Sequence, residues 1–139
     1  MAELSSHHIG ITVRDLDRAV DFYTSVFDCP VLATFEVAGE AFETGVDIDA
    51  ASAQFAHLDV GSVRLELVAY DPAGDDSETP QLNDQGATHL GLEVEDLDRF
   101  YAALSADVET LSPPQTTETG TKILFVRDPE GNLIEVLEL

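Results

Sequence analysis

Apolar and polar residues alternate along eight short stretches of the chain, and this period of two is typical of β-strands with one apolar face. The stretches cover residues 8–13, 31–37, 54–60, 63–70, 88–94, 108–111, 122–127 and 132–137. Two other stretches, 16–27 and 97–104, repeat apolar residues at intervals of three and four, which predicts amphipathic helices. Asp15 and Asp96 are suitable N-caps for these helices, and Pro30 is expected to end the first one.

Segments without periodicity separate these elements. Residues 38–53 are predicted to form an acidic, glycine-containing loop, and the polar segment 112–120 a mobile one. A tight turn is expected at Gly61–Ser62, and a second turn at 128–132, where Pro and Gly favour the required backbone angles. Residues 71–86 are rich in Pro, Gly, Asp and Ser and are predicted to be a linker.

The chain repeats itself. Residues 8–18 and 89–99 are identical at seven of eleven positions, and residues 64–68 resemble residues 133–137. A tandem duplication of this kind predicts an α+β fold of two βαβββ modules that form a curved mixed sheet with helices on the outside. We expect a single domain over 1–139, with module one at 5–70, the linker at 71–86 and module two at 87–139.

Each module opens with a histidine and closes with a glutamate: His8 and Glu66 in the first, His89 and Glu135 in the second. The alternation places Glu66 on the face opposite Leu65 and Leu67. Two imidazoles and two carboxylates suit a divalent first-row metal, whereas a closed structural zinc site would favour thiolates. The duplication by itself leaves two explanations open, because folding constraints also preserve repeats.

Three other residues of chemical interest are interpreted as structural. His7 and His57 have no counterpart in the repeat and are expected to be surface or satisfied core histidines. Cys29 is the single cysteine, so it cannot form an internal disulfide, and we expect a small buried apolar side chain.

The net charge of the chain limits the classes of molecule that it can bind. Asp and Glu number 28 against 6 Lys and Arg, which gives a formal net charge of −22, and Lys122 is the single lysine. Such a chain repels nucleic acids and anionic membranes. Salt screens the self-repulsion of the acidic surface, so the composition predicts a halophilic protein. No secretory signal or membrane-length apolar run is visible, and we expect a cytoplasmic location.

Three motifs carry a resemblance to a known family. They are the opening His8–Ala19 segment followed by Phe22–Tyr23, the middle segment 88–92, and the closing segment 127–135. They resemble the vicinal oxygen chelate superfamily, which includes glyoxalase I, methylmalonyl-CoA epimerase, extradiol dioxygenases and bleomycin- and fosfomycin-resistance proteins. Matched residue by residue, His8, Glu66, His89 and Glu135 occupy the four metal-ligand positions of glyoxalase I-like members.

The resemblance implies a metal-dependent lyase or isomerase of glyoxalase I type, which transfers a proton next to a carbonyl through a metal-stabilised enediolate on a small metabolite or thiol adduct. Glu135 is the expected base and Glu66 the group that returns the proton. Arg64 and Lys122 are candidates for contacting a substrate anion. The metal can be Ni, Co, Zn, Mn or Fe, because the same donors suit all of them.

Two other functions stay open at this point. One is an isomerase similar to methylmalonyl-CoA epimerase, although the chain offers few cations for CoA phosphates. The other is a non-catalytic protein that binds a small molecule such as an antibiotic. Extradiol dioxygenases use three ligands and are usually longer. A homodimer is the expected assembly, because symmetric pairs are the commonest one and exposed sheet edges seek cover.

Overall fold

The computed structural model describes residues 2–76 and 80–139, and the chain divides into a first unit, Met1–Asp76, and a second unit, Ser77–Leu139. Residues 77–79 of the predicted linker lie outside the described residues. Each unit contains a mixed sheet and at least one helix, which confirms the predicted α+β class. In the part of the chain that is described, no helix is both long and apolar enough to cross a membrane.

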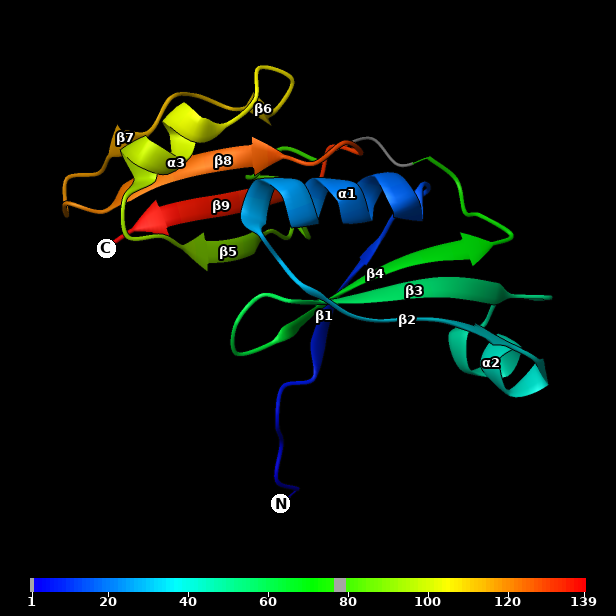
Figure 1. Cartoon of the computed structure of the whole chain (residues 1–139). Coiled ribbons are helices and arrows are strands. Elements are labelled where there is room, and N and C mark those ends of the chain that lie inside the picture. Colours follow the sequence, from blue (N-terminus) through cyan, green and yellow to red (C-terminus); the bar gives the residue numbers. More distant parts are fainter. Residues whose placement is uncertain (1, 77–79) are drawn as a thin grey trace. The chain divides into compact units, whose positions relative to one another are not determined.

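The first unit is built on a four-stranded sheet with the order β1-β4-β3-β2 (Figure 1). β1 pairs with β4 in parallel, and the other two pairings are antiparallel. The elements in chain order are β1 (His8–Thr12), α1 (Leu16–Phe27), β2 (Val31–Ala38), α2 (Glu40–Val46), β3 (Ser52–Asp59) and β4 (Arg64–Asp71).

Hydrogen bonds and backbone conformation at its two ends determine where helix α1 begins and ends. The side chain of Asp15 accepts a hydrogen bond from the backbone N–H of Arg18, as predicted for an N-cap. The helix ends at Phe27 because Asp28 adopts a left-handed conformation with φ 53°, and its N–H bonds to the carbonyl of Tyr23. The prediction assigned this role to Pro30. Ala19 and Tyr23 form the buried side of the helix.

The two faces of the first sheet differ in chemistry. Leu65 and Leu67 are fully buried and alternate with Arg64 and Glu66 along β4. The opposite face carries Glu66 near one end and a small apolar cluster near the other. This cluster comprises Ala53, Phe55 and Val68, with Val37, Phe42 and Tyr70 packed against it. Helix α2 therefore covers one end of the Glu66 face through Phe42.

The second unit repeats this plan with shorter elements. Its sheet has the order β5-β9-β8-β6, with β7 also paired to β8, and β5 pairs with β9 in parallel. The Asp96 side chain caps the helix as predicted, by accepting from the N–H of Arg99. The elements are β5 (Leu90–Glu93), α3 (Leu97–Ala103), β6 (Glu109–Thr110), β7 (Gln115–Thr116), β8 (Lys122–Arg127) and β9 (Leu133–Glu138).

Two predicted loops contain regular structure. The segment 38–53 was predicted to be a loop, but residues 40–46 form α2, whose N-cap is Gly39 and has no side-chain cap bond. Its stabilising contacts come from Phe42, which packs against Phe55 and stacks on Tyr70. The segment 112–120 was predicted to be a mobile loop, but Gln115–Thr116 pairs with β8 as β7. Helix α2 depends on partners distant in sequence, which local patterns do not reveal, whereas β7 pairs with the next strand along the chain.

Candidate functional site

His8 and Glu66 lie together on one face of the first sheet. The parallel pairing of β1 with β4 places His8 beside Arg64 and Gly10 beside Glu66, so the histidine and the glutamate share a face two residues apart. His8 Nε2 is 3.5 Å from Glu66 Oε1, and the two side chains are 38% and 15% exposed. This pair is partly open to solvent.

His57 contacts the same carboxylate. It lies opposite Glu66 in the β3–β4 pairing, is 7% exposed, and its Nε2 is 2.7 Å from Glu66 Oε2. His57 is thus a buried histidine whose ring is hydrogen-bonded, as expected, and its partner is Glu66, one of the predicted site residues. The sequence contained a signal for this contact: His57 lies four residues before Gly61 and Glu66 four residues after Ser62, so the predicted tight turn pairs them.

His89 and Glu135 form the corresponding pair in the second unit. Gly91 lies beside Glu135 in the parallel pairing of β5 with β9, and His89 directly precedes β5. His89 Nε2 is 3.2 Å from Glu135 Oε2, with side chains 38% and 23% exposed. The residue opposite Glu135 in β8 is Phe125, whose ring meets His89 edge to face with centroids 5.3 Å apart.

Both pairs have donor spacings that fit a metal ion. A tetrahedral ion with bonds of about 2.1 Å holds neighbouring donors roughly 3.4 Å apart, and the two pairs measure 3.5 and 3.2 Å. Glycine leaves space beside each carboxylate. A Cβ on Gly10 would lie 3.9 Å from Glu66 Oε1 and 3.9 Å from His8 Cδ2, and a Cβ on Gly91 would meet nothing within 4 Å.

Neither pair makes a complete metal site alone. In residues 2–76 and 80–139, no group of three or more His, Cys, Asp or Glu side chains is arranged to hold a metal ion. Each unit contributes one imidazole and one carboxylate of the four predicted ligands.

The two candidate substrate contacts differ in position. Arg64 lies on the same face as His8 and Glu66 and is exposed. Lys122 and Phe125 have opposite parity in β8, so Lys122 lies on the face away from Glu135. Its Nζ donates to Asp98 at 2.8 Å, and this hydrogen bond raises the pKa of the Lys122 ammonium. The fold of the second unit does not bring Lys122 to Glu135, so Lys122 is not one of the proposed site residues.

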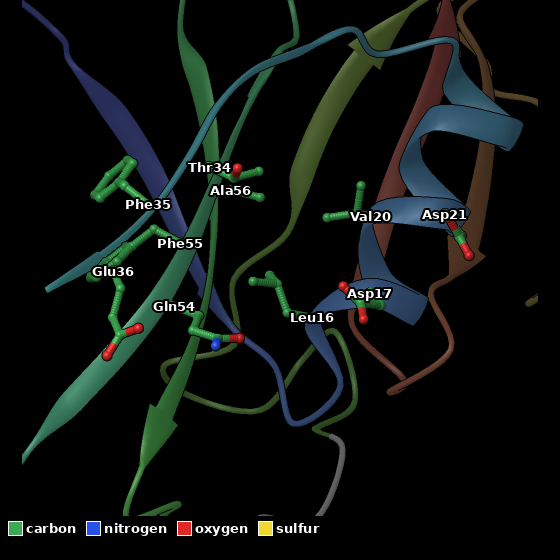
Figure 2. Close-up of a pocket in the computed structure, with 10 residues that line it drawn as sticks. All are labelled: Leu16, Asp17, Val20, Asp21, Thr34, Phe35, Glu36, Gln54, Phe55 and Ala56. Carbon is green, nitrogen blue, oxygen red and sulfur yellow. The ribbon is translucent and has the colours of Figure 1, made fainter.

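A hollow of about 620 Å³ lies on the other side of the first sheet (Figure 2). Figure 2 shows Leu16 and Val20 of α1 pointing toward Thr34 and Ala56, whereas Phe35 points away from the helix. Because Ala56 pairs with Leu67, this is the face opposite Glu66. A smaller hollow of about 350 Å³ is lined in part by His7, which precedes His8, and by Arg64, the strand partner of His8.

Cys29 is not a candidate nucleophile. It is 5% exposed, as expected for a small buried side chain. Burial raises the pKa of its thiol, and the nearby carboxylates of Asp59 and Asp28 raise that pKa further. A thiol of this kind is protonated at neutral pH and reacts slowly.

Comparisons with known proteins identify the family of this chain and its fold. The model of the Glyoxalase/Bleomycin resistance protein/Dioxygenase superfamily matches residues 5–136. One relative is the 2-epi-5-epi-valiolone epimerase of an Actinomyces species. It is 33% identical over 143 residues, which cover 96% of this chain and 78% of the relative.

Two solved structures share the fold. A glyoxalase family protein from Bacillus cereus superimposes with a TM-score of 0.87 at 22% identity, over 99% of this chain and 95% of that one. The trypanothione-dependent glyoxalase I of Leishmania major superimposes with a TM-score of 0.71 at 27% identity, over 98% and 87%.

Proposed function

Because this chain belongs to the glyoxalase/bleomycin resistance protein/dioxygenase superfamily, we propose that it is a metal-dependent enzyme that transfers a proton next to a carbonyl group of a small molecule. The proposed ligands are His8 and Glu66 from the first unit and His89 and Glu135 from the second. Any of Ni, Co, Zn, Mn or Fe suits this set of donors.

The observation that carries this proposal is the repeated pair. In each unit a glutamate near the middle of a strand lies within 3.5 Å of a histidine on the same face, and a glycine keeps the neighbouring position empty. Structural duplication alone explains the shared fold. Partly exposed donors at metal-like spacing in both copies support a metal site over a purely structural pair.

A divalent cation bound by this set would polarise a substrate carbonyl and lower the pKa of the adjacent C–H. Glu135 accepts that proton on a carboxylate oxygen, because it is the more exposed of the two glutamates and its 3.2 Å contact with His89 is longer than the 2.7 Å contact of Glu66 with His57. The proton then returns to the same carbon from the other side, or to the neighbouring carbon. The first outcome is epimerisation and the second is the glyoxalase I type of isomerisation.

Epimerisation is the outcome we place first. The curated relative at 33% identity is named as an epimerase. A glutathione adduct carries two carboxylates, whereas this chain has five arginines and one lysine, of which Arg64 lies on the Glu66 face. A neutral or weakly charged carbonyl compound is therefore the substrate class that the chain fits best.

The test is hydrogen exchange at the α-carbon. Metal-loaded protein in D₂O is offered cyclic polyhydroxy ketones, methylmalonyl-CoA and hemithioacetals, and deuterium uptake is followed by NMR. We expect exchange with the uncharged ketones, dependent on Glu135. Exchange with the CoA ester alone would favour the methylmalonyl-CoA epimerase type, and exchange with hemithioacetals alone would favour glyoxalase I.

Metal analysis separates an enzyme from a sequestering protein. We expect bound Ni, Co, Mn, Fe or Zn in the purified wild type, and less in variants that lack His8 or His89. Protein that never retains metal and shows no exchange, but binds a small molecule tightly, would support the binding alternative. Oxygen uptake with catechols in the presence of Fe(II) would indicate dioxygenase chemistry instead.

We also propose that the chain forms a homodimer. In the first sheet β1 and β2 are edge strands, and Ile9, Val31 and Leu32 on these strands are exposed apolar residues. Light scattering gives the oligomeric state. Mixing two inactive variants, Glu66→Gln and Glu135→Gln, tests whether ligands are shared between chains, because only a shared site regains activity on mixing.

The acidic surface is proposed to be an adaptation to high salt. The net charge of −22 implies strong self-repulsion at low ionic strength. The Debye length falls from about 10 Å at 0.1 M salt to about 3 Å at 1 M, so added KCl should raise the melting temperature. A melting temperature that is the same at low and at molar KCl would contradict the proposal.

A further inference from the structure

The two candidate glutamates have different neighbours across the hairpin. Opposite Glu66 lies His57, and opposite Glu135 lies Phe125. The duplicated strands therefore carry the same carboxylate in two environments, one with a hydrogen-bond donor and one with an apolar ring. This is the largest chemical difference between the two pairs.

His57 holds one oxygen of Glu66. A carboxylate has acceptors only, so the His57 Nε2–H donates to Glu66 Oε2, at 2.7 Å. The other oxygen, Oε1, is the one that faces His8 Nε2 at 3.5 Å. The two oxygens thus have separate partners, and a bond to His57 leaves Oε1 available to a metal on the His8 side.

The His57 ring is itself fixed. It is 7% exposed, the ring of Phe35 meets it edge to face with centroids 5.1 Å apart, and the His8 ring stacks at 6.0 Å. A ring packed on two sides and bonded at Nε2 has one orientation. The hydrogen bond from this fixed ring therefore holds the Glu66 carboxylate in one orientation.

Glu135 has no such partner among the contacts of the described residues. It contacts His89 at 3.2 Å, and the Phe125 ring opposite it offers no N–H or O–H. The Glu135 carboxylate is also the more exposed of the two, at 23% against 15%. Glu135 is therefore held by fewer contacts than Glu66.

We propose that His57 is a positioning residue that makes Glu66 a stationary metal ligand, and that Phe125 at the equivalent place leaves Glu135 free to act as the mobile base. This inference rests on the proposed function for the presence of a metal. It narrows the role of Glu66 to that of a ligand. The proton then returns from Glu135 to the neighbouring carbon, or a water molecule protonates the opposite face of the same carbon while Glu135 gives its proton to solvent.

The experiment is a double-mutant cycle on metal affinity. Binding of Mn²⁺ and Ni²⁺ is measured by calorimetry for the wild type, His57→Phe, Glu66→Gln and the double variant. We expect His57→Phe to weaken binding by about 10- to 100-fold, as is usual when a residue that orients a ligand is lost. We expect it to have no further effect when Glu66 is already Gln. His57→Gln keeps an N–H donor and should retain most of the affinity.

The reciprocal variant tests the other unit. Phe125→His offers a donor to Glu135, so it should leave metal affinity unchanged or higher and lower kcat with little change in KM. If His57→Phe fails to fold, as judged by circular dichroism, His57→Leu and Phe125→His carry the same test. A purely structural role of His57 predicts lower stability without the dependence on Glu66.

The outcomes separate the two proposals. Wild-type protein that binds neither metal overturns the proposed function and this inference together. Wild-type protein that binds metal, with His57→Phe binding equally well, overturns the inference alone. An equal loss of affinity from His57→Phe in the wild-type and Glu66→Gln backgrounds also overturns it, because His57 would then act without Glu66.

Discussion

The first and second units repeat one another in sequence and in strand pairing, yet the hairpins that carry their glutamates differ. In the first unit β3 places a buried imidazole against Glu66, whereas in the second unit β8 places a phenyl ring beside His89 and Glu135. Duplication supplied two equal carboxylates. A single cross-strand residue in each copy then determines which carboxylate is held and which can move.

The largest effect should come from exchanging the carboxylates one at a time. We expect Glu135→Gln to lower kcat by about 10²- to 10⁴-fold, the range typical of a general base, while most of the metal affinity is kept. Glu66→Gln should weaken metal binding more than Glu135→Gln does. Metal titration and steady-state kinetics on both variants check this, and an equal loss of affinity in the two would show that the units are not specialised.

The turns of the two hairpins offer a comparison of stability. The Asp128 carboxylate is 5% exposed and accepts from the N–H groups of Glu130 and Asn132 and from Asn132 Nδ2. In the first unit, Asp59 is exposed, and its side chain accepts a hydrogen bond from the N–H of Gly61 at 2.8 Å.

We expect Asp128→Ala to lower the free energy of unfolding by about 3 kcal/mol, because three partly buried donors lose a buried, charged acceptor. Asp59→Ala should lower it by about 1 kcal/mol or less, because water replaces the lost partner. Urea denaturation measures both. Asp128→Asn keeps part of the network and serves as the control, and similar losses in Asp128→Ala and Asp59→Ala would contradict this account.

Many of the helix bounds and strand faces were predictable because they follow from local sequence patterns. The bounds of α1 followed from the Asp15 cap and the apolar stripe, and the facing of Glu66 followed from the alternation in β4. Helix α2 was missed because it has no capping side chain and is stabilised by Phe42 against a ring of another strand.

The candidate site was only partly predictable. The contact between His57 and Glu66 follows from the centre of the Gly61–Ser62 turn, and applying that register would have found it. The position of Lys122 was open to the same reasoning, because its parity in β8 is opposite to that of Phe125. How α3 supplies Asp98 to Lys122 is a tertiary contact that spacing does not encode.

The two glycines provide a sharper test of where the metal lies. A side chain at Gly10 would start 3.9 Å from Glu66 Oε1, whereas one at Gly91 would start in open space. We expect Gly10→Val to weaken metal binding by at least tenfold, or about 1.4 kcal/mol, and Gly91→Val to weaken it less. Calorimetric titration measures the difference. The same loss in both variants would show that the space beside Glu66 is not specially required.

The smallest expected difference concerns the N-caps of α1 and α3, where both copies of the repeat carry an aspartate. Asp15 accepts from Arg18 N at 3.0 Å and Asp96 from Arg99 N at 2.9 Å. Replacing either with Ala should cost about 1 kcal/mol of unfolding free energy, the usual value for a lost N-cap.

In α3 the N–H of Leu97 is also satisfied by Glu138 at 2.8 Å, and this bond survives the loss of Asp96. The short α3 therefore should not lose more than the longer α1, and Asp→Asn variants at both sites, which retain the cap, should be nearly neutral in urea denaturation. A markedly larger loss at Asp96 would mean that the second unit depends on its cap in a way that the first does not.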